Sequence, residues 1–90
     1  MHYTYVLRST MYRRLYVGCT SDLKRRLDEH NAGKNISTKP YIPYEVIYYE
    51  ALPTLEESVV RERFYKTGRG REVLEKILFK TLSQERHKPS

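Results

Sequence analysis

The chain has 90 residues, enough for one domain with a small core, and its 17 Lys and Arg against 11 Asp and Glu give a formal net charge of +6. No apolar run comes near the ~20 residues that cross a bilayer, and apolar and aromatic residues recur too regularly for general disorder. The single cysteine, Cys19, excludes an internal disulfide and a cysteine-based zinc finger, and without a visible secretory signal we expect a cytoplasmic protein.

The first elements in the chain predict a β-hairpin. Residues 3–8 and 14–19 are rich in β-branched and aromatic side chains, and only a short connection separates them. Two antiparallel strands are therefore expected. If the turn centres on residues 10–11, Tyr5 lies opposite Tyr16 on one face of the hairpin.

A helix follows the hairpin. Either Thr20 or Ser21 can cap it, and Asp22 is then favourably placed at the positive end of the helix dipole. Gly33 is positioned to end the helix in a left-handed conformation. Residues 34–43 are polar and contain two prolines, which predicts a loop.

The second half of the chain begins with a third strand, predicted over residues 44–50. Thr54 and Glu57 then form the T-x-x-E pattern of a capping box, which predicts a helix over about 55–66. Residues 67–70, with two glycines, are expected to break this helix.

An amphipathic stripe predicts a third helix, with Leu74, Ile77, Leu78, Thr81 and Leu82 on one face. Residues 83–90 are polar and predict a flexible tail, so the expected single domain spans residues 1–82. The order ββαβαα indicates an α/β (α+β) fold, in which helices flank a three-stranded antiparallel sheet.

Three polar side chains could carry chemistry. Arg26 and His30 are four residues apart, so they share one face of the first helix. Glu62 continues a stripe that begins with Leu55 and Val59, and a carboxylate in such a stripe needs a partner or a metal. The alternatives are a solvated pair on a charged helix and a structural salt bridge from Glu62 to a nearby arginine.

The basic excess favours a polyanionic partner: nucleic acid or an acidic membrane surface, against an ordinary solvated surface. The segment 68–71, Gly-Arg-Gly-Arg, could bind phosphate through backbone N–H groups and guanidinium groups, or could simply link two helices. Cys19 is expected to be a small buried hydrophobic residue. His2 and His87 lie near the ends of the chain and are expected to be exposed.

Together these residues form a family pattern. Tyr3-Thr4-Tyr5 and Tyr16-Val17-Gly18 resemble the paired motifs of the GIY-YIG nuclease family, although the first motif keeps only its tyrosine. Arg26 stands ten residues after Tyr16, His30 follows four residues later, and Glu62 lies in the helix after the third strand, as in that family. The resemblance covers residues 3 to about 76 and is closest to the small, stand-alone, single-domain branch. The family's asparagine after the metal-binding helix has no counterpart here.

The resemblance implies a metal-dependent endonuclease that hydrolyses phosphodiester bonds in nucleic acid, with DNA the expected substrate and repair or recombination the expected role. It implies that Glu62 binds Mg²⁺ or Mn²⁺ and that Arg26 braces the scissile phosphate. Tyr5 would activate water, His30 would accept its proton, and Tyr16 would position the water or share the role of base. The residues expected to bind nucleic acid are Gly18, Lys24, Arg25, Lys34, Lys39, Arg69 and Arg71. The alternative is a nucleic-acid-binding module of the same fold that does not cleave.

Overall fold

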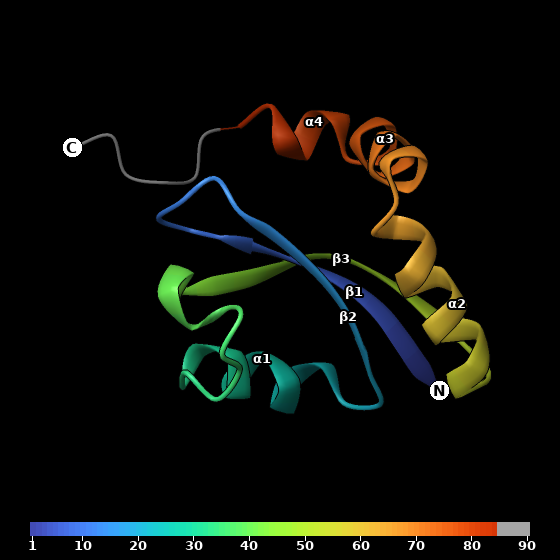
Figure 1. Ribbon diagram of the computed structural model, residues 1–90, viewed down its shortest axis with the longest axis horizontal. Coiled ribbons are helices and arrows are strands. Elements are labelled where there is room, and N and C mark those ends of the chain that lie inside the picture. The colour runs from blue at the N-terminus through green and yellow to red at the C-terminus, as the bar shows by residue number, and fades with distance from the viewer. Residues whose placement is uncertain (85–90) are drawn as a thin grey trace.

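The computed structural model describes residues 1–84 as a three-stranded antiparallel sheet with helices on both faces (Figure 1). The strand order is β2-β1-β3, so β1 is central. The strands are β1 (His2–Ser9), β2 (Leu15–Thr20) and β3 (Tyr44–Leu52). The helices are α1 (Leu23–Asn31), α2 (Leu55–Tyr65), α3 (Gly68–Ile77) and α4 (Phe79–Leu82), with a 3-10 turn, η1 (Lys39–Tyr41), before β3. This architecture confirms the predicted fold class.

The central strand supplies both halves of the core, because successive side chains of a strand point to opposite faces. Val6 packs with Tyr65 and Leu74 on the face that α2 and α3 cover. Tyr5 and Leu7 lie on the other face, which α1 covers. The two clusters therefore fix the helices on opposite sides of one strand, and α1 delivers its polar residues to the face that carries Tyr5.

The hairpin register differs from the prediction. Tyr5 pairs with Gly18, and Tyr16 pairs with Leu7. The turn is centred on residues 11–12 rather than 10–11, because Arg8 pairs with Leu15. In this turn the Ser9 hydroxyl accepts hydrogen bonds from the backbone N–H groups of Met11 and Tyr12. The strand pairing is therefore shifted by two residues from the predicted register. An even shift leaves each side chain on its predicted face of the sheet, so Tyr5 and Tyr16 still share one side.

The helix ends show which local signals act. Asp22, and not Thr20 or Ser21, is the N-cap of α1, and its carboxylate accepts from the N–H of Arg25. Gly33 adopts the predicted left-handed conformation, with φ of +79°. The Thr54 hydroxyl caps α2 as predicted.

The predicted break over residues 67–70 is shorter than expected. The Thr67 hydroxyl accepts from the N–H of Gly70, so α3 already begins at Gly68. The amphipathic stripe ends with α3 and resumes in the separate short helix α4. Of the predicted tail, only residues 83–84 lie within the described chain. No helix in that described part is long and apolar enough to cross a membrane.

Candidate active site

A buried hydrogen-bonded chain links the sheet to the loop after α1. The Tyr5 Oη lies 3.0 Å from His30 Nε2, and His30 Nδ1 lies 2.8 Å from the Thr38 Oγ1. Thr38 donates its own hydroxyl proton to the carbonyl of Asn35, so its oxygen accepts from His30 Nδ1–H. Nε2 is then left without a proton, and Tyr5 donates to it. The Nδ1–H tautomer and the direction of the chain are inferred from the contact of the Thr38 hydroxyl with the Asn35 carbonyl at 3.4 Å.

Electrostatics keep both ends of this hydrogen bond neutral. Burial, together with the positive charge of Arg26, lowers the pKa of His30 to about 4. Burial raises the pKa of Tyr5 to about 12, although the nearby Arg26 guanidinium opposes part of that effect. At neutral pH the proton therefore stays on the tyrosine oxygen, and His30 holds an open lone pair towards it.

Arg26 lies at the solvent side of this chain. Its Nη1 donates to Glu29 Oε1 at 2.9 Å, and 31% of its side chain is exposed. Arg26 and His30 do share a face of α1, as predicted, but they differ in depth, because His30 is fully buried in the last turn. The helix therefore presents a buried proton acceptor and an accessible guanidinium beside the same tyrosine.

Gly18 makes room for Tyr5. A Cβ atom at this position would lie 2.6 Å from the Tyr5 Oη and 2.8 Å from its Cζ, closer than real contacts allow. Gly18 is itself buried. The close approach that requires glycine in β2 is thus that of the tyrosine ring, whereas Gly18 was expected to bind nucleic acid. The glycine sets the place of the phenol rather than offering a free backbone surface.

Tyr16 extends the cluster towards solvent. Its ring centroid lies 5.0 Å from that of His30 and 6.4 Å from that of Tyr5. The Lys66 ammonium lies 5.6 Å from the Tyr16 ring centroid, so Tyr16 stands between the proton chain and α2. The two tyrosines of the sequence motifs, the histidine and an α2 cation therefore occupy one neighbourhood.

Glu62 faces this neighbourhood from α2, but its partners were not predicted. Lys66 Nζ lies 2.6 Å from Oε2, and Cys19 Sγ donates to Oε1 at 3.0 Å. Burial alone would raise the pKa of Glu62, but these two donors hold it below its usual value. The alternative of a structural salt bridge at Glu62 is therefore met, with Lys66 as the cation in place of an arginine. Arg61 pairs with Glu50, and Arg26 pairs with Glu29.

Two other expectations are also corrected. Cys19 is only half-buried and acts as a hydrogen-bond donor to the site, and its pKa is raised to about 11 by burial and by Glu62. His2 is partly buried rather than exposed, with Nδ1 enclosed. His87 lies outside the described residues.

The donor set around Glu62 restricts the metals that it can hold. No group of three or more His, Cys, Asp and Glu side chains that could hold a metal occurs within residues 1–84, which argues against a closed structural zinc site there. One ionised, partly exposed carboxylate fits Mg²⁺ or Mn²⁺, because magnesium is commonly held by one or two carboxylates while water and phosphate oxygens complete the shell. The Lys66 ammonium already supplies one positive charge to this carboxylate.

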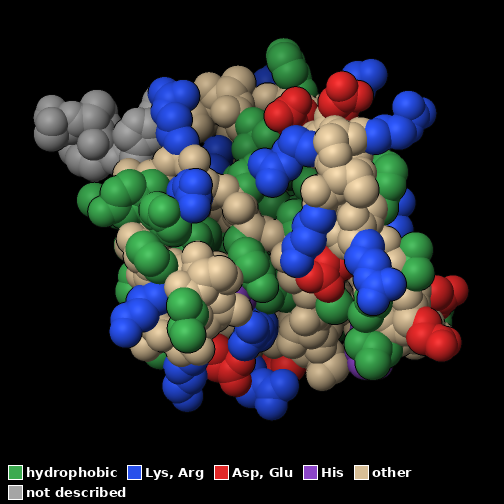
Figure 2. All heavy atoms as spheres, viewed as in Figure 1, with side chains coloured by type: hydrophobic (Ala, Val, Ile, Leu, Met, Phe, Trp, Pro, Cys, Tyr) green, Lys and Arg blue, Asp and Glu red, His purple; other side chains and the backbone are tan. Residues whose placement is uncertain are grey.

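The predicted nucleic-acid-binding side chains lie at the surface of the protein. Six basic residues from that prediction are exposed: Lys24, Arg25, Lys34, Lys39, Arg69 and Arg71. Lys24 pairs with Asp28 on the surface of α1. On the face shown in Figure 2, basic side chains outnumber acidic ones, which suits a polyanionic partner.

Comparisons with known proteins agree with the fold. The family model described as the GIY-YIG catalytic domain matches residues 1–84. UPF0213 proteins of Streptococcus pyogenes serotypes M3 and M1 are 39% identical over 70 residues, which cover 77% of this chain and 75% of theirs. The solution NMR structure of a UPF0213 protein from Bacillus halodurans is 30% identical, with a TM-score of 0.52 and coverage of 84% of this chain and 83% of that one.

Proposed function

Because the chain belongs to the GIY-YIG family, whose domain indicates nuclease activity in general, we propose that it is an endonuclease that hydrolyses phosphodiester bonds with the help of one divalent metal ion. The observation that carries the proposal is the hydrogen bond from Tyr5 to the neutral, buried His30. A proton acceptor behind a phenol, with Arg26 and Glu62 nearby, is an arrangement suited to activating water at a phosphate.

The proton of the attacking water would leave along the buried chain. The water oxygen bonds to phosphorus as the P–O bond to the leaving strand end breaks, and the leaving oxygen takes a proton from solvent. The proton of the attacking water passes to the Tyr5 Oη while the phenolic proton passes to His30 Nε2. The pKa values of about 12 for Tyr5 and about 4 for His30 oppose this transfer in the resting protein. It therefore requires positive charge near the phenol as the water attacks, and Arg26 is placed to supply some of it.

Arg26 would hold the phosphate that is cleaved. One of its nitrogens is fixed by Glu29, which orients the guanidinium and leaves further N–H groups free to donate. A planar guanidinium can contact two phosphate oxygens at once and stabilise the charge that grows on them during attack. Tyr16, on the open side of His30, would position the water or share the role of base.

Glu62 would hold the Mg²⁺ or Mn²⁺ ion, and the bound metal would neutralise charge on the phosphate and the leaving oxygen. In the structure Lys66 balances the same carboxylate at 2.6 Å. A bound metal would therefore compete with the Lys66 ammonium for this carboxylate, so we expect a weak site that is strengthened by substrate phosphate. The net charge of +6 supports nucleic acid as the substrate, with DNA the first candidate and repair or recombination the expected role.

The test is a panel of labelled DNA and RNA strands, duplexes, flaps and branches incubated with Mg²⁺, with Mn²⁺ or with chelator. We expect cleavage only with metal, and loss of cleavage in Glu62→Gln. Glu56→Gln, a matched change in the exposed first turn of the same helix, should cleave like the parent. Metal-independent binding without cleavage of any substrate would instead favour the non-catalytic module.

A further inference from the structure

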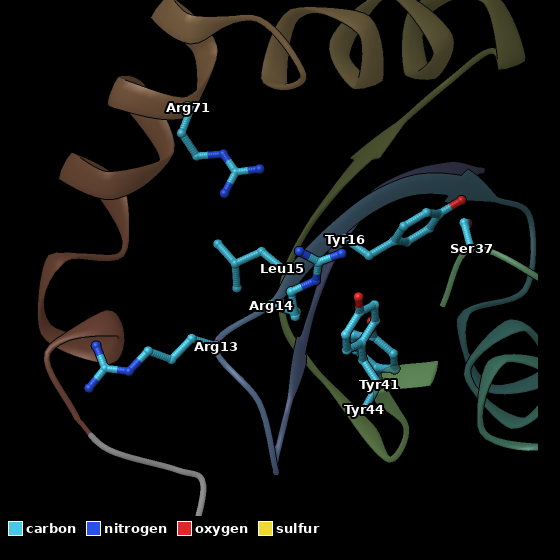
Figure 3. Close-up of a pocket in the computed structure, with 8 residues that line it drawn as sticks. All are labelled: Arg13, Arg14, Leu15, Tyr16, Ser37, Tyr41, Tyr44 and Arg71. Atoms are coloured by element: carbon cyan, nitrogen blue, oxygen red, sulfur yellow. The ribbon is translucent and has the colours of Figure 1, made fainter. Parts of the chain in front are cut away.

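A basic and aromatic pocket opens beside Tyr16, outside the proton chain (Figure 3). Its volume is about 280 Å³. The hairpin turn, the loop before β3 and helix α3 contribute the walls. The lining residues are Arg13, Arg14, Leu15, Tyr16, Ser37, Tyr41, Tyr44 and Arg71. None of them is acidic, so the pocket is electropositive and suits an anionic ligand.

The pocket also contains a flat stack. The guanidinium carbon of Arg14 lies 4.1 Å from the ring centroid of Tyr41. Tyr12 contacts the same ring edge-on, with centroids 5.6 Å apart. An arginine that lies on an aromatic ring offers planar groups on which a nucleobase can stack, because every base has a π-face.

Arg71 approaches from the opposite wall. In Figure 3 its side chain extends from α3 towards Leu15 and Arg14, whereas Arg13 points away from Tyr41. Two guanidinium groups, Arg14 and Arg71, therefore face the space next to the stack. Such a pair can hold a phosphate while the base lies against Tyr41.

We propose that this pocket binds one unpaired nucleotide of a single-stranded segment that lies next to the phosphodiester to be cleaved. The proposal rests on the proposed function and adds the substrate class. The pocket volume of about 280 Å³ lies just below the ~300–1,000 Å³ range of ligand pockets, which suits a single nucleotide unit. Since Tyr16 lines this pocket and also contacts His30, a strand held here lies next to the active-site cluster.

The test measures binding without metal, so it does not depend on cleavage. The probes are a short fluorescein-labelled oligothymidylate and the same strand annealed to its complement, read by anisotropy in chelator. We expect Tyr41→Ala to weaken binding of the single strand by about tenfold, a loss typical of removing one stacked aromatic ring. Tyr41→Phe, which keeps the ring, should bind like the parent. Duplex binding should change less than twofold in both variants.

Arg71→Ala tests the phosphate contact at an exposed position where folding is not at stake. We expect weaker single-strand binding and a log–log salt slope smaller by ~0.7, as for one phosphate contact on a single strand. Lys76→Ala removes one charge from the same helix about 140° away and should leave the slope unchanged.

Three binding results would overturn the proposal. The first is an equal loss of single-strand affinity in Arg71→Ala and Lys76→Ala, and the second is parental single-strand binding by Tyr41→Ala. The third is an equal loss of affinity for the single strand and for the duplex in Tyr41→Ala. Competition by thymidine monophosphate as strong as by the strand would assign the pocket to a free nucleotide and also overturn it. Failure of the proposed function looks different: no substrate is cleaved with metal, whatever these binding measurements give.

Discussion

The burial of His30 as a neutral imidazole predicts a specific dependence of folding stability on pH. Its pKa is about 4 in the folded chain against 6.5 for a solvated histidine side chain, so the unfolded chain binds the proton first as pH falls. The stabilisation is therefore complete above about pH 6.5 and is lost as pH falls through the window between about 6.5 and 4. With ~1.36 kcal/mol per pKa unit, the loss between about pH 7.5 and 5 is roughly 2 kcal/mol.

Urea unfolding at these two pH values measures the effect. For a slope of ~1–3 kcal/mol per molar urea, the midpoint of the parent should fall by about 1 M. His30→Gln keeps polar atoms near Tyr5 and Thr38 but cannot titrate, so its midpoint should change much less. The difference between the two proteins cancels the contributions of other groups. Identical pH dependence in parent and variant would refute the neutral, buried imidazole and with it the proton chain.

Three further changes test other contacts. Gly18→Ala places a methyl group 2.6 Å from the Tyr5 Oη and should lower the free energy of unfolding by ~1–3 kcal/mol in urea; an unchanged midpoint would mean that the ring has room to move. Gly70→Ala directs a methyl group into the carbonyl oxygen of Phe64 and should abolish close packing of α2 on α3, seen as a strongly lowered melting temperature, and a parental melting curve would contradict it. Lys66→Met removes the ammonium that competes at Glu62 and should lower the Mg²⁺ concentration needed for half-maximal cleavage; the same metal requirement as the parent would count against that competition.

Local sequence signals predicted most of the fold. The predictions were wrong in detail at positions where two local signals compete. Asp22 is the N-cap of α1, although the neighbouring residues Thr20 and Ser21 also carry hydroxyl groups that can cap a helix. The Thr67 hydroxyl allowed α3 to start on Gly68, although glycines there suggested a longer break. The hairpin register depended on the Ser9 side chain in the turn, where no Asn-Gly pair marks the centre.

The candidate site also contains contacts that the sequence predicted and contacts that it missed. Arg26 and His30 could be placed on one face from helical spacing alone, because both lie on one helix. Cys19 and Lys66 were missed as partners of Glu62, since the Cys19 contact depends on how α2 packs across β2. The i, i+4 spacing of Glu62 and Lys66 was a visible signal for the second partner.

The loop residue Thr38, which orients His30, and the pocket beside Tyr16 had no sequence signal. Both arise where the loop after α1 folds back against the sheet. Such contacts join residues that no helical or strand periodicity relates.

The most direct test of the central claim compares Arg26 with Arg25 in single-turnover cleavage and in equilibrium binding. Adjacent residues of a helix point about 100° apart, so the two changes remove equal charge from different faces. If Arg26 stabilises the cleaved phosphate, Arg26→Ala should reduce the cleavage rate by about a hundredfold or more with little change in binding. Arg26→Lys should restore little, because an ammonium cannot make the planar two-oxygen contact, whereas Arg25→Ala should weaken binding and leave the rate on bound substrate near the parental value. Equal effects of both alanine changes, seen in binding and not in rate, would contradict the account.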